Sequence, residues 1–433
     1  MDHFTETTRT SYGQNIGNSF KGILFGFVLI AISIGLIWWN EGRSVERADA
    51  LSSMSENIVT LQGTNYEMTN DSKAVLIQGE VKALSKLKDE MFGVESDGLA
   101  LRRTVMMYQW KENKTTRTEE KVGGSTETIT EYDYVKEWAF GRNDSSSFKH
   151  REGHENPMLD YKTQNYLSDA NLGDFYLSKN VVGYISASRA YDGLSTLPKK
   201  IGQATNYNSY LYIGKDPSTP LVGDVKISYS YTPTGVYTFA AKQDGKNLSA
   251  FRTKNGTSLL FARTGRVDAA TIFQEEQDAN AMLTWILRGA GLFMMFIGFT
   301  LIMGPLATLA NVLPFLGSLV GGVTSIVAGV LTILLGSIVI ALAWFGARPM
   351  LSLALIVVGV GVTVFAMKFK KSDTSDEKRD SHRQNRDEED VQPPRREAKP
   401  DENAQPPKRE VNPKEEVKPP QRKRATPPLR RES

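Results

Sequence analysis

The chain of 433 residues contains no cysteine and only four histidines. The absence of cysteine excludes disulfide bonds and thiolate metal sites, so a folded domain must be held together by its own core. Also absent are the Gly-x-Ser-x-Gly elbow, the Walker loop and the dinucleotide fingerprint. We therefore expect a protein that is not an enzyme and that has no catalytic residues, no cofactor and no bound metal.

Two of the histidines, His150 and His154, lie four positions apart in the segment KHREGHENP. Zinc proteases place their two histidines on a helix in the order His-Glu-x-x-His, whereas the order here is His-Arg-Glu-Gly-His. Gly153 disfavours a helix, Pro157 restricts the residue before it, and a third histidine ligand is missing. We interpret the segment as a loop in which His154 and Asn156 form hydrogen bonds to backbone.

A weaker alternative for the same segment is an oxygen-ligand site of the calcium type. Glu152, Glu155 and Asp160 supply carboxylates. Nothing in their spacing matches a known calcium loop.

Long apolar runs are the main feature that is present. Residues 22–39 carry no charge, and Arg348 is the only ionisable residue between Gly289 and Met367. A helix needs roughly 20 apolar residues to cross a bilayer, so these runs predict transmembrane helices. The first run follows a long polar leader and lacks the small residues of a signal-peptidase site, so we expect an uncleaved anchor.

Four spans fit these runs, and we expect the second block to divide at Gly304-Pro305, at Pro314 and at Arg348-Pro349, because proline removes a helix donor. The predicted organisation begins with a cytoplasmic segment 1–21, a span 22–39 and an extracytoplasmic or luminal domain 40–287. A block 288–368 follows, with spans at about 288–308, 317–344 and 349–368. The cytoplasmic tail is predicted at 369–433. The cluster Lys368, Lys370 and Lys371 indicates by the positive-inside rule that both termini are cytoplasmic.

The exported part reads as an α+β domain with an antiparallel sheet. A short juxtamembrane helix is expected at 44–58, and strands at 74–81, 99–110 and 126–138, with a hairpin at Gly123-Gly124. Turns at Asp244-Gly245 and Asn255-Gly256 predict an antiparallel meander over 224–264. Asp268 is expected to cap a helix that continues without a break into the second span.

From Lys371 the aromatic residues vanish and Pro-Pro recurs before basic residues. Such a segment cannot bury enough apolar surface to offset the entropy of ordering it, so we expect a disordered tail. It is either a solvated tether, which we favour, or a polyproline or basic segment that binds a partner or anionic lipid.

Small residues in the spans indicate close helix packing, within one chain or between copies. Gly317, Gly321 and Gly329 are the candidate packing residues. Ionisable side chains fall only at span ends, which favours a self-associating protein over a transporter. A channel or channel subunit formed by the C-terminal spans is the alternative. Charges of both signs are interleaved in the folded part, so we expect no nucleic-acid partner.

Several strings make the chain similar to a known family. It resembles the LUMA, or transmembrane protein 43, family, which has one N-terminal span, a large exported domain and three C-terminal spans. The residues that carry the resemblance are Asn40, Glu41, Gly42 and Arg43; Arg102, Arg103, Tyr108 and Trp110; Gly153, His154, Asn156 and Pro157; Gly223 and Asp224; Trp285 and Arg288; and Arg348 and Pro349.

The resemblance implies a non-enzymatic multi-pass membrane protein that self-associates and acts as a scaffold for membrane protein complexes. In animals it implies the endoplasmic reticulum and the inner nuclear membrane, with emerin and lamins as partners. In bacteria it implies the inner membrane, which we favour for this cysteine-free chain. Membrane lipid and further copies of the chain are the partners expected in either case.

Overall fold

The computed structural model describes residues 2–186, 188–344, 357–363 and 365. All of them belong to one compact unit, Met1–Lys368, and the predicted disordered tail lies outside the described residues. Arg348, Pro349 and most of the predicted fourth span lie outside them as well, and the described residues 357–363 of that span are helical.

Three helices of the described part are long and apolar enough to cross a membrane: α1 (Tyr12–Asn57), α3 (Ala269–Ala310) and α4 (Pro314–Trp344). The predicted first span and the predicted juxtamembrane helix are one continuous helix, α1. Asp268 accepts a hydrogen bond from the Thr271 N–H and caps α3, which confirms the predicted helix that runs into the second span. The predicted break at Gly304-Pro305 is wrong, because α3 continues through Pro305.

Glycines let α1 and α3 pack closely at Gly26 and Gly298, and of the predicted packing residues Gly317 is also tightly enclosed, because a Cβ atom there would clash with the Asn311 side chain. A Cβ atom on Gly26 would lie 2.6 Å from the Gly298 carbonyl oxygen, and one on Gly298 would lie 2.9 Å from that of Gly26. By contrast, a Cβ atom on Gly329 would meet nothing within 4 Å, and one on Gly321 only the Ala307 methyl at 3.9 Å. Within one chain the close helix contact therefore depends on Gly26 and Gly298.

The described strands form two large sheets and two small ones. The first large sheet holds β1 (Asp2–Thr10), β6 (Ala100–Glu120), β7 (Thr126–Phe140), β8 (Gln164–Leu167), β11 (Arg189–Ala190), β12 (Lys200–Ile201), β13 (Ala204–Asn206), β14 (Leu211–Ile213) and β15 (Val225–Thr232). Its strand order is β1-β7-β6-β15-β14-β13-β12. The edge strand β1 is the most N-terminal element of the chain.

The second large sheet has the order β2-β3-β9-β10-β17-β16-β20, and β3 also pairs with β16. Its strands are β2 (Val59–Thr60), β3 (Ala74–Ala83), β9 (Ala170–Leu172), β10 (Phe175–Leu177), β16 (Gly235–Asp244), β17 (Asn247–Ser249) and β20 (Phe261–Thr264). The small sheets are β4 (Leu87–Asp89) with β5 (Val94–Ser96), and β18 (Phe251–Arg252) with β19 (Ser258–Leu259). Short helices are α2 (Lys179–Val182), η1 (Met68–Asn70), η2 (Ser145–Ser147) and η3 (Gly193–Thr196).

The predicted hairpins, in which a short turn joins two strands that are adjacent in the sequence, are confirmed. β6 and β7 form the hairpin expected at Gly123-Gly124, and both glycines have a positive φ. The hairpins at Asp244-Gly245 and Asn255-Gly256 also form. The single meander over 224–264 is wrong, because β15 and β16 belong to different sheets and β16 pairs with the distant β3.

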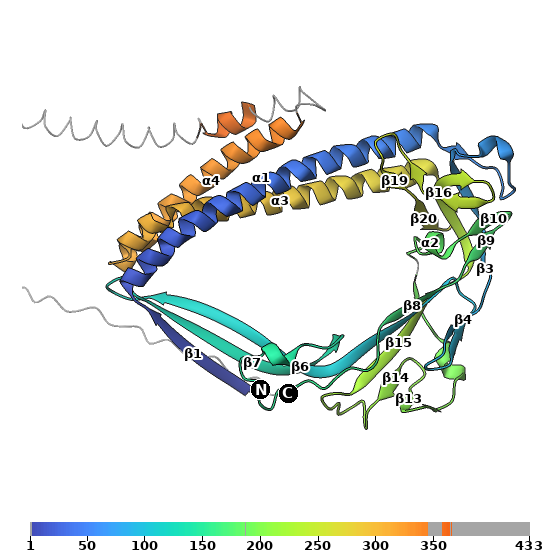
Figure 1. Cartoon of the computed structure of the whole chain (residues 1–433), viewed down its shortest axis with the longest axis horizontal. Coiled ribbons are helices and arrows are strands. Elements are labelled where there is room, and N and C mark those ends of the chain that lie inside the picture. The colour runs from blue at the N-terminus through green and yellow to red at the C-terminus, as the bar shows by residue number, and fades with distance from the viewer. Residues whose placement is uncertain (1, 187, 345–356, 364, 366–433) are drawn as a thin grey trace, which may run out of the picture. The chain divides into compact units, whose positions relative to one another are not determined.

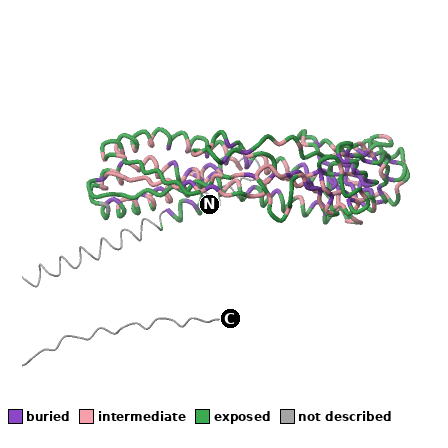
Figure 2. The backbone as a smooth tube through the Cα atoms, turned by 90° about the horizontal axis from the view of Figure 1, so that it is seen from below, coloured by how far each residue is buried: buried purple, intermediate pink, exposed green. Residues whose placement is uncertain are grey.

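Three apolar clusters make up the core of the sheets, and one of them fastens the helices. Figure 2 shows the buried residues concentrated at the end of the molecule where the sheets lie. In that fastening cluster, Leu51 and Met54 of α1 and Phe273 of α3 pack against Leu76 of β3 and Phe261 of β20. The C-terminal end of α1 and the N-terminal end of α3 are thus embedded in the domain.

Strand β1 corrects the predicted boundary at the N-terminus. Asp2–Thr10 pairs with Tyr134–Thr126 of β7 over nine consecutive positions. Paired strands lie about 4.8 Å apart in one aqueous compartment. The prediction that residues 1–21 and the domain lie on opposite sides of the membrane therefore cannot hold for these two strands (Figure 1).

The tip of the β6–β7 hairpin holds the other end of the helices. The Gly123 N–H donates to the Val312 carbonyl at 3.1 Å, and the Asn15 amide donates to the Gly124 carbonyl at 3.0 Å. The Tyr12 hydroxyl donates to the Leu309 carbonyl at 3.1 Å. At about 3.3 Å per residue, β6 spans about 69 Å, which matches the length of α1 at about 1.5 Å per residue. The hairpin tip therefore contacts the ends of α1 and α3 that lie far from the second sheet (Figure 1).

The cysteine-free chain allows a direct test of the β1–β7 pairing. Thr8 lies opposite Thr128. We expect the Thr8→Cys/Thr128→Cys variant to form an intramolecular disulfide on mild oxidation, because directly opposed Cα atoms are about 4.5–5.5 Å apart. Thiol titration and mass spectrometry measure it. In the control Thr7→Cys/Thr128→Cys the two side chains point to opposite faces, and equal yields from the two variants would contradict the register.

Candidate functional site

A polar junction lies where the apolar helices meet the domain. It is made by residues 40–47 of α1, residues 276–288 of α3 and Trp344 of α4. Two of the strings that carry the family resemblance supply it, and they are more than 230 positions apart in the sequence. The fold brings them together because α1 and α3 pack side by side along their length (Figure 1).

The centre of the junction is a buried ion pair. Glu41 has no exposed surface, and the Arg288 guanidinium donates to both of its oxygens at 2.5 and 2.6 Å. The Trp344 indole N–H also donates to Glu41. The Arg288 guanidinium lies 4.7 Å from the ring centre of Trp285 and 5.5 Å from that of Trp344. Both charges are thus paired, and the cation is also shielded by aromatic rings.

A second layer of hydrogen bonds surrounds Arg43. Its guanidinium donates to the side chains of Asn280 at 3.0 Å, Thr284 at 3.1 Å and Asn40 at 3.2 Å. The Asn40 amide donates to the Thr284 carbonyl at 3.1 Å, and the Asn280 amide donates to the Ser44 carbonyl at 2.9 Å. Four of these hydrogen bonds join α1 to α3, and the bond from Arg43 to Asn40 lies within α1.

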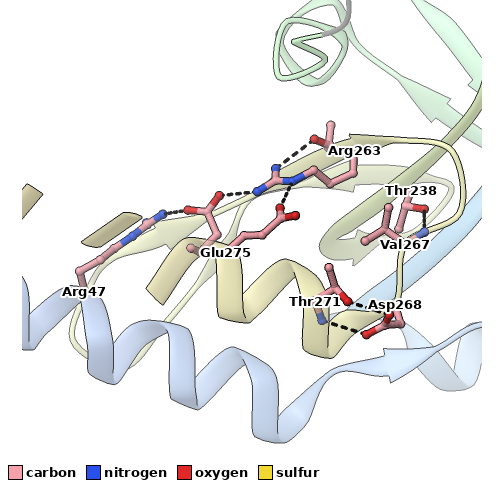
Figure 3. Close-up of polar contacts among 9 residues, drawn as sticks. Arg47, Thr238, Arg263, Val267, Asp268, Thr271 and Glu275 are labelled. Carbon is pink, nitrogen blue, oxygen red and sulfur yellow. Dashed lines mark hydrogen bonds and ion pairs between the residues drawn. The ribbon is translucent and has the colours of Figure 1, made fainter. Parts of the chain in front are cut away.

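The network continues into the sheet. Glu276 of α3 accepts from Arg47 of α1 and from Arg263 of β20, both at 2.9 Å (Figure 3). Arg263 also donates to Glu275 at 2.9 Å. Burial lowers the pKa of Arg263, but the two carboxylates outweigh burial and raise it. The helix pair and the second sheet are therefore joined by a continuous chain of charges.

The start of α3 is held at the same place. Asp268 accepts from the backbone and hydroxyl of Thr271, both at 2.8 Å, and these bonds lower the pKa of its carboxyl (Figure 3). The Val267 N–H donates to the Thr238 hydroxyl at 3.0 Å. These contacts set the direction in which α3 leaves the sheet.

The loop with the two histidines lies at a second site, on the first sheet. His154 is buried, stacks on Tyr134 at 3.9 Å, and has Nε2 3.1 Å from the Asp2 carboxylate. Its Nδ1 lies 2.9 Å from the His150 carbonyl. Among the described residues no group of three or more His, Cys, Asp or Glu is placed to hold a metal ion.

The Asn156 side chain takes the place that a neighbouring strand would occupy beside Trp110 of β6. It accepts from the Trp110 N–H at 2.7 Å and donates to the Trp110 carbonyl at 2.9 Å. Its own N–H donates to the Ser145 hydroxyl at 3.0 Å. The side-chain amide thus satisfies both backbone groups of a β6 residue beyond the end of β15.

Other resemblance residues contact β6 along the same edge, between Asn156 and β15. The Gly223 N–H donates to the Tyr108 carbonyl, and the Tyr108 N–H donates to the Asp224 carbonyl, both at 2.8 Å. Gly223 has φ +102°, and a Cβ atom there would lie 2.9 Å from Pro157. A side chain at this position would be strained and crowded, which explains the glycine.

The adjacent arginines of β6 have different environments. Arg103 is buried and donates twice to Asp89 through one nitrogen, at 2.7 and 2.8 Å, while Tyr229 donates to the same carboxylate at 2.7 Å. Burial, and then the bond to Asp89, raises the pKa of Tyr229. Arg102 points to the opposite face and is exposed, as strand alternation requires.

Sequence reasoning missed several members of these sites. Asn280, Glu276 and Arg263 of the junction were not singled out, nor were Asp2 and Asp89 on the first sheet. One signal was present for the junction: Asn280, Thr284 and Arg288 recur every four residues and form a polar stripe on an otherwise apolar helix. No local pattern marks Asp2, because its partner lies 152 positions away.

Comparison with known proteins identifies the family. A family model described as Transmembrane protein 43 matches residues 107–349, which is more than half of the chain. The chain belongs to the transmembrane protein 43 family. The human transmembrane protein 43 is 28% identical over 370 residues, which are 82% of this chain and 91% of the human protein.

Other relatives in this family give similar values. The mouse protein is 29% identical over 80% of this chain and 89% of its own length. A transmembrane protein 43 homolog from Drosophila melanogaster is 26% identical over 82% of this chain and 96% of its own length. No solved structure matches the chain. These names describe membrane proteins and none describes an enzyme.

The buried pair at the junction is testable by stability. Removing one partner leaves an uncompensated buried charge, which costs roughly 3–5 kcal/mol. We expect Glu41→Gln to lower the thermal unfolding midpoint in detergent by at least about 5 °C. Tryptophan fluorescence measures it, since Trp285 and Trp344 lie at the pair.

Two further variants control this measurement. Glu41→Leu/Arg288→Met removes both charges and should recover part of the loss. Glu80→Gln removes an exposed ion pair with Lys82 and should change the midpoint little. A Glu41→Gln midpoint equal to that of Glu80→Gln would mean that the buried pair does not stabilise the junction.

The contribution of the Asn156 side chain to stability is testable by the same measurement of the thermal unfolding midpoint. Asn156→Leu leaves the Trp110 N–H without its partner, at a cost of about 1–3 kcal/mol, while the Trp110 carbonyl keeps the hydrogen bond from the Asn143 amide at 3.1 Å. We expect the midpoint to fall by several degrees. Asn113→Leu, on the exposed part of β6, is the matched control. Similar midpoints for the two variants would show that the amide does not secure β6.

Proposed function

We propose that this chain is a non-enzymatic membrane protein that self-associates through its helices and organises membrane protein complexes. The observation that carries the proposal is the polar junction. Buried charges and hydrogen bonds make the helices and the second sheet one connected body. An event at the domain surface is then passed to the membrane helices as a change in their position, which suits a scaffold.

The outer faces of the helices support self-association. Large apolar side chains of α3 and α4 are more than half exposed in the single chain, among them Phe293, Leu306, Phe315, Leu319 and Ile326. Such faces contact lipid or another apolar helix. Gly321 and Gly329 leave open space beside α4, where a helix of a second copy can approach closely.

The compartment and the partners follow from the resemblance alone and remain predictions. The predicted compartment is the bacterial inner membrane. The alternative is the endoplasmic reticulum and the inner nuclear membrane, with emerin and lamins as partners. The predicted cytoplasmic orientation of the C-terminal tail also remains a prediction.

The helix proposal is tested by the oligomer mass in detergent or nanodiscs. We expect Gly321→Leu/Gly329→Leu to reduce the oligomer and leave the unfolding midpoint unchanged, because both substitutions meet little within one chain. Gly298→Leu is the matched control, since it crowds α1 and should lower the midpoint. An unchanged oligomer in the double variant would remove the helix mechanism.

A monomeric wild-type protein would remove self-association altogether. Conductance of the purified protein in planar bilayers would instead support a channel formed by the C-terminal spans.

A further inference from the structure

Three strands form a polar ribbon, defined as Asp2–Thr10 of β1, Thr126–Tyr134 of β7 and Glu112–Glu120 of β6. The registers place Asp2 opposite Tyr134 and Tyr134 opposite Glu112. At the other end Thr10 lies opposite Thr126, which lies opposite Glu120. β1 and β6 therefore occupy the same nine levels on either side of β7 (Figure 1).

Both outer edges of the ribbon lack a neighbouring strand in the part of the chain that the structure describes. β1 ends the strand order of its sheet. β15 covers the second edge of β6 only from Ala100 to Met107, and the contacts with Asp224 and Asn156 extend this cover to Trp110. The backbone groups of the remaining edge residues are open to pairing.

The two edges point in the same direction. β1 and β6 are each antiparallel to β7, so they are parallel to each other. A second copy that lies beside the first in the same orientation would bring its β1 next to the free edge of β6. Copies of an integral membrane protein share their orientation in the bilayer, so parallel edges are the ones that can meet repeatedly.

The side chains on the two edges are complementary at three of the shared levels, whereas at the base of the ribbon Asp2 would face the like charge of Glu112. Thr8 would face Thr118, and Thr5 would face Thr115, while Arg9 would face Glu119. Threonine pairs and opposite charges are favourable cross-strand neighbours. Both faces of the ribbon carry Thr, Glu, Arg and Lys, so the ribbon is unsuited to contact with lipid chains.

We propose that β1 of one copy pairs, in parallel, with the free edge of β6 in the next copy, so that neighbouring ribbons form one continuous sheet. This contact is heterologous, because different edges meet, and it repeats from copy to copy around a ring. The inference rests on the self-association proposed above and names the surface that directs it.

Disulfide cross-linking tests the proposal on the full-length protein in nanodiscs or native membranes. In Thr8→Cys/Thr118→Cys the two positions of one chain are separated by β7 and lie about 9.6 Å apart, too far for an internal disulfide. We expect mild oxidation to give a ladder of covalent dimers, trimers and larger species on non-reducing gels. Thr8→Cys/Thr116→Cys samples a register shifted by two residues. The ladder from one of these two variants supports the proposal.

The controls separate the proposal from its alternatives. Thr7→Cys/Thr118→Cys places the thiols on opposite faces and should give no ladder. Dimers from Thr8→Cys alone, without a ladder from either pair, would indicate two-fold β1–β1 pairing and overturn the proposal. The wild-type oligomer mass, measured in parallel, separates the two failures: an oligomer without any ladder overturns the edge contact only, whereas a monomer overturns self-association itself.

Discussion

The salt bridge between Glu41 and Arg288 holds three helices together at the point where they meet the domain. A carboxylate with no exposed surface is stable among apolar helices only if its charge is paired and its lone pairs are satisfied. Arg288 and Trp344 meet that requirement from two other helices. The pair therefore fixes the relative position of α1, α3 and α4 in a way that apolar packing alone does not, because lipid chains compete with apolar contacts.

From this point the structure extends in two directions. Toward the domain, Arg47, Glu276 and Arg263 carry the hydrogen-bonded chain into β20, and the apolar cluster around Leu51 and Phe273 adds packing. Away from the domain, α1 and α3 run side by side until the tip of the β6–β7 hairpin contacts them again. The helices are thus held at both ends by one domain, which limits their freedom to rotate or slide independently.

The hairpin tip shows how tight this second attachment is. A Cβ atom on Gly124 would lie 2.3 Å from the Tyr12 ring, and the residue has φ +77°. Only glycine combines that backbone conformation with so close an approach. The loop at His154 and Asn156 secures the base of the same ribbon by joining β1, β6 and β7. The loop therefore fixes three strands relative to one another at one end of the ribbon.

Features that depend on local composition could be predicted from the sequence without the fold. The uncharged run 22–39 and the block after Gly289 defined membrane helices, Asp268 marked a helix start, and Gly123-Gly124 marked a hairpin. The family followed from strings such as Asn40 to Arg43 and Trp285 to Arg288. Periodicity, caps and turns act between neighbours in the chain, so they can be read without the fold.

Contacts between segments that lie far apart in the sequence became known from the fold alone. The pairing of β1 with β7, the division of β15 and β16 between two sheets, and the contact of Glu41 with Arg288 all join residues far apart in sequence. A polar strand such as Asp2–Thr10 has the same local pattern whether it pairs or stays free. Its free energy of pairing comes from contacts with a partner strand more than a hundred positions away, so no local pattern can reveal it.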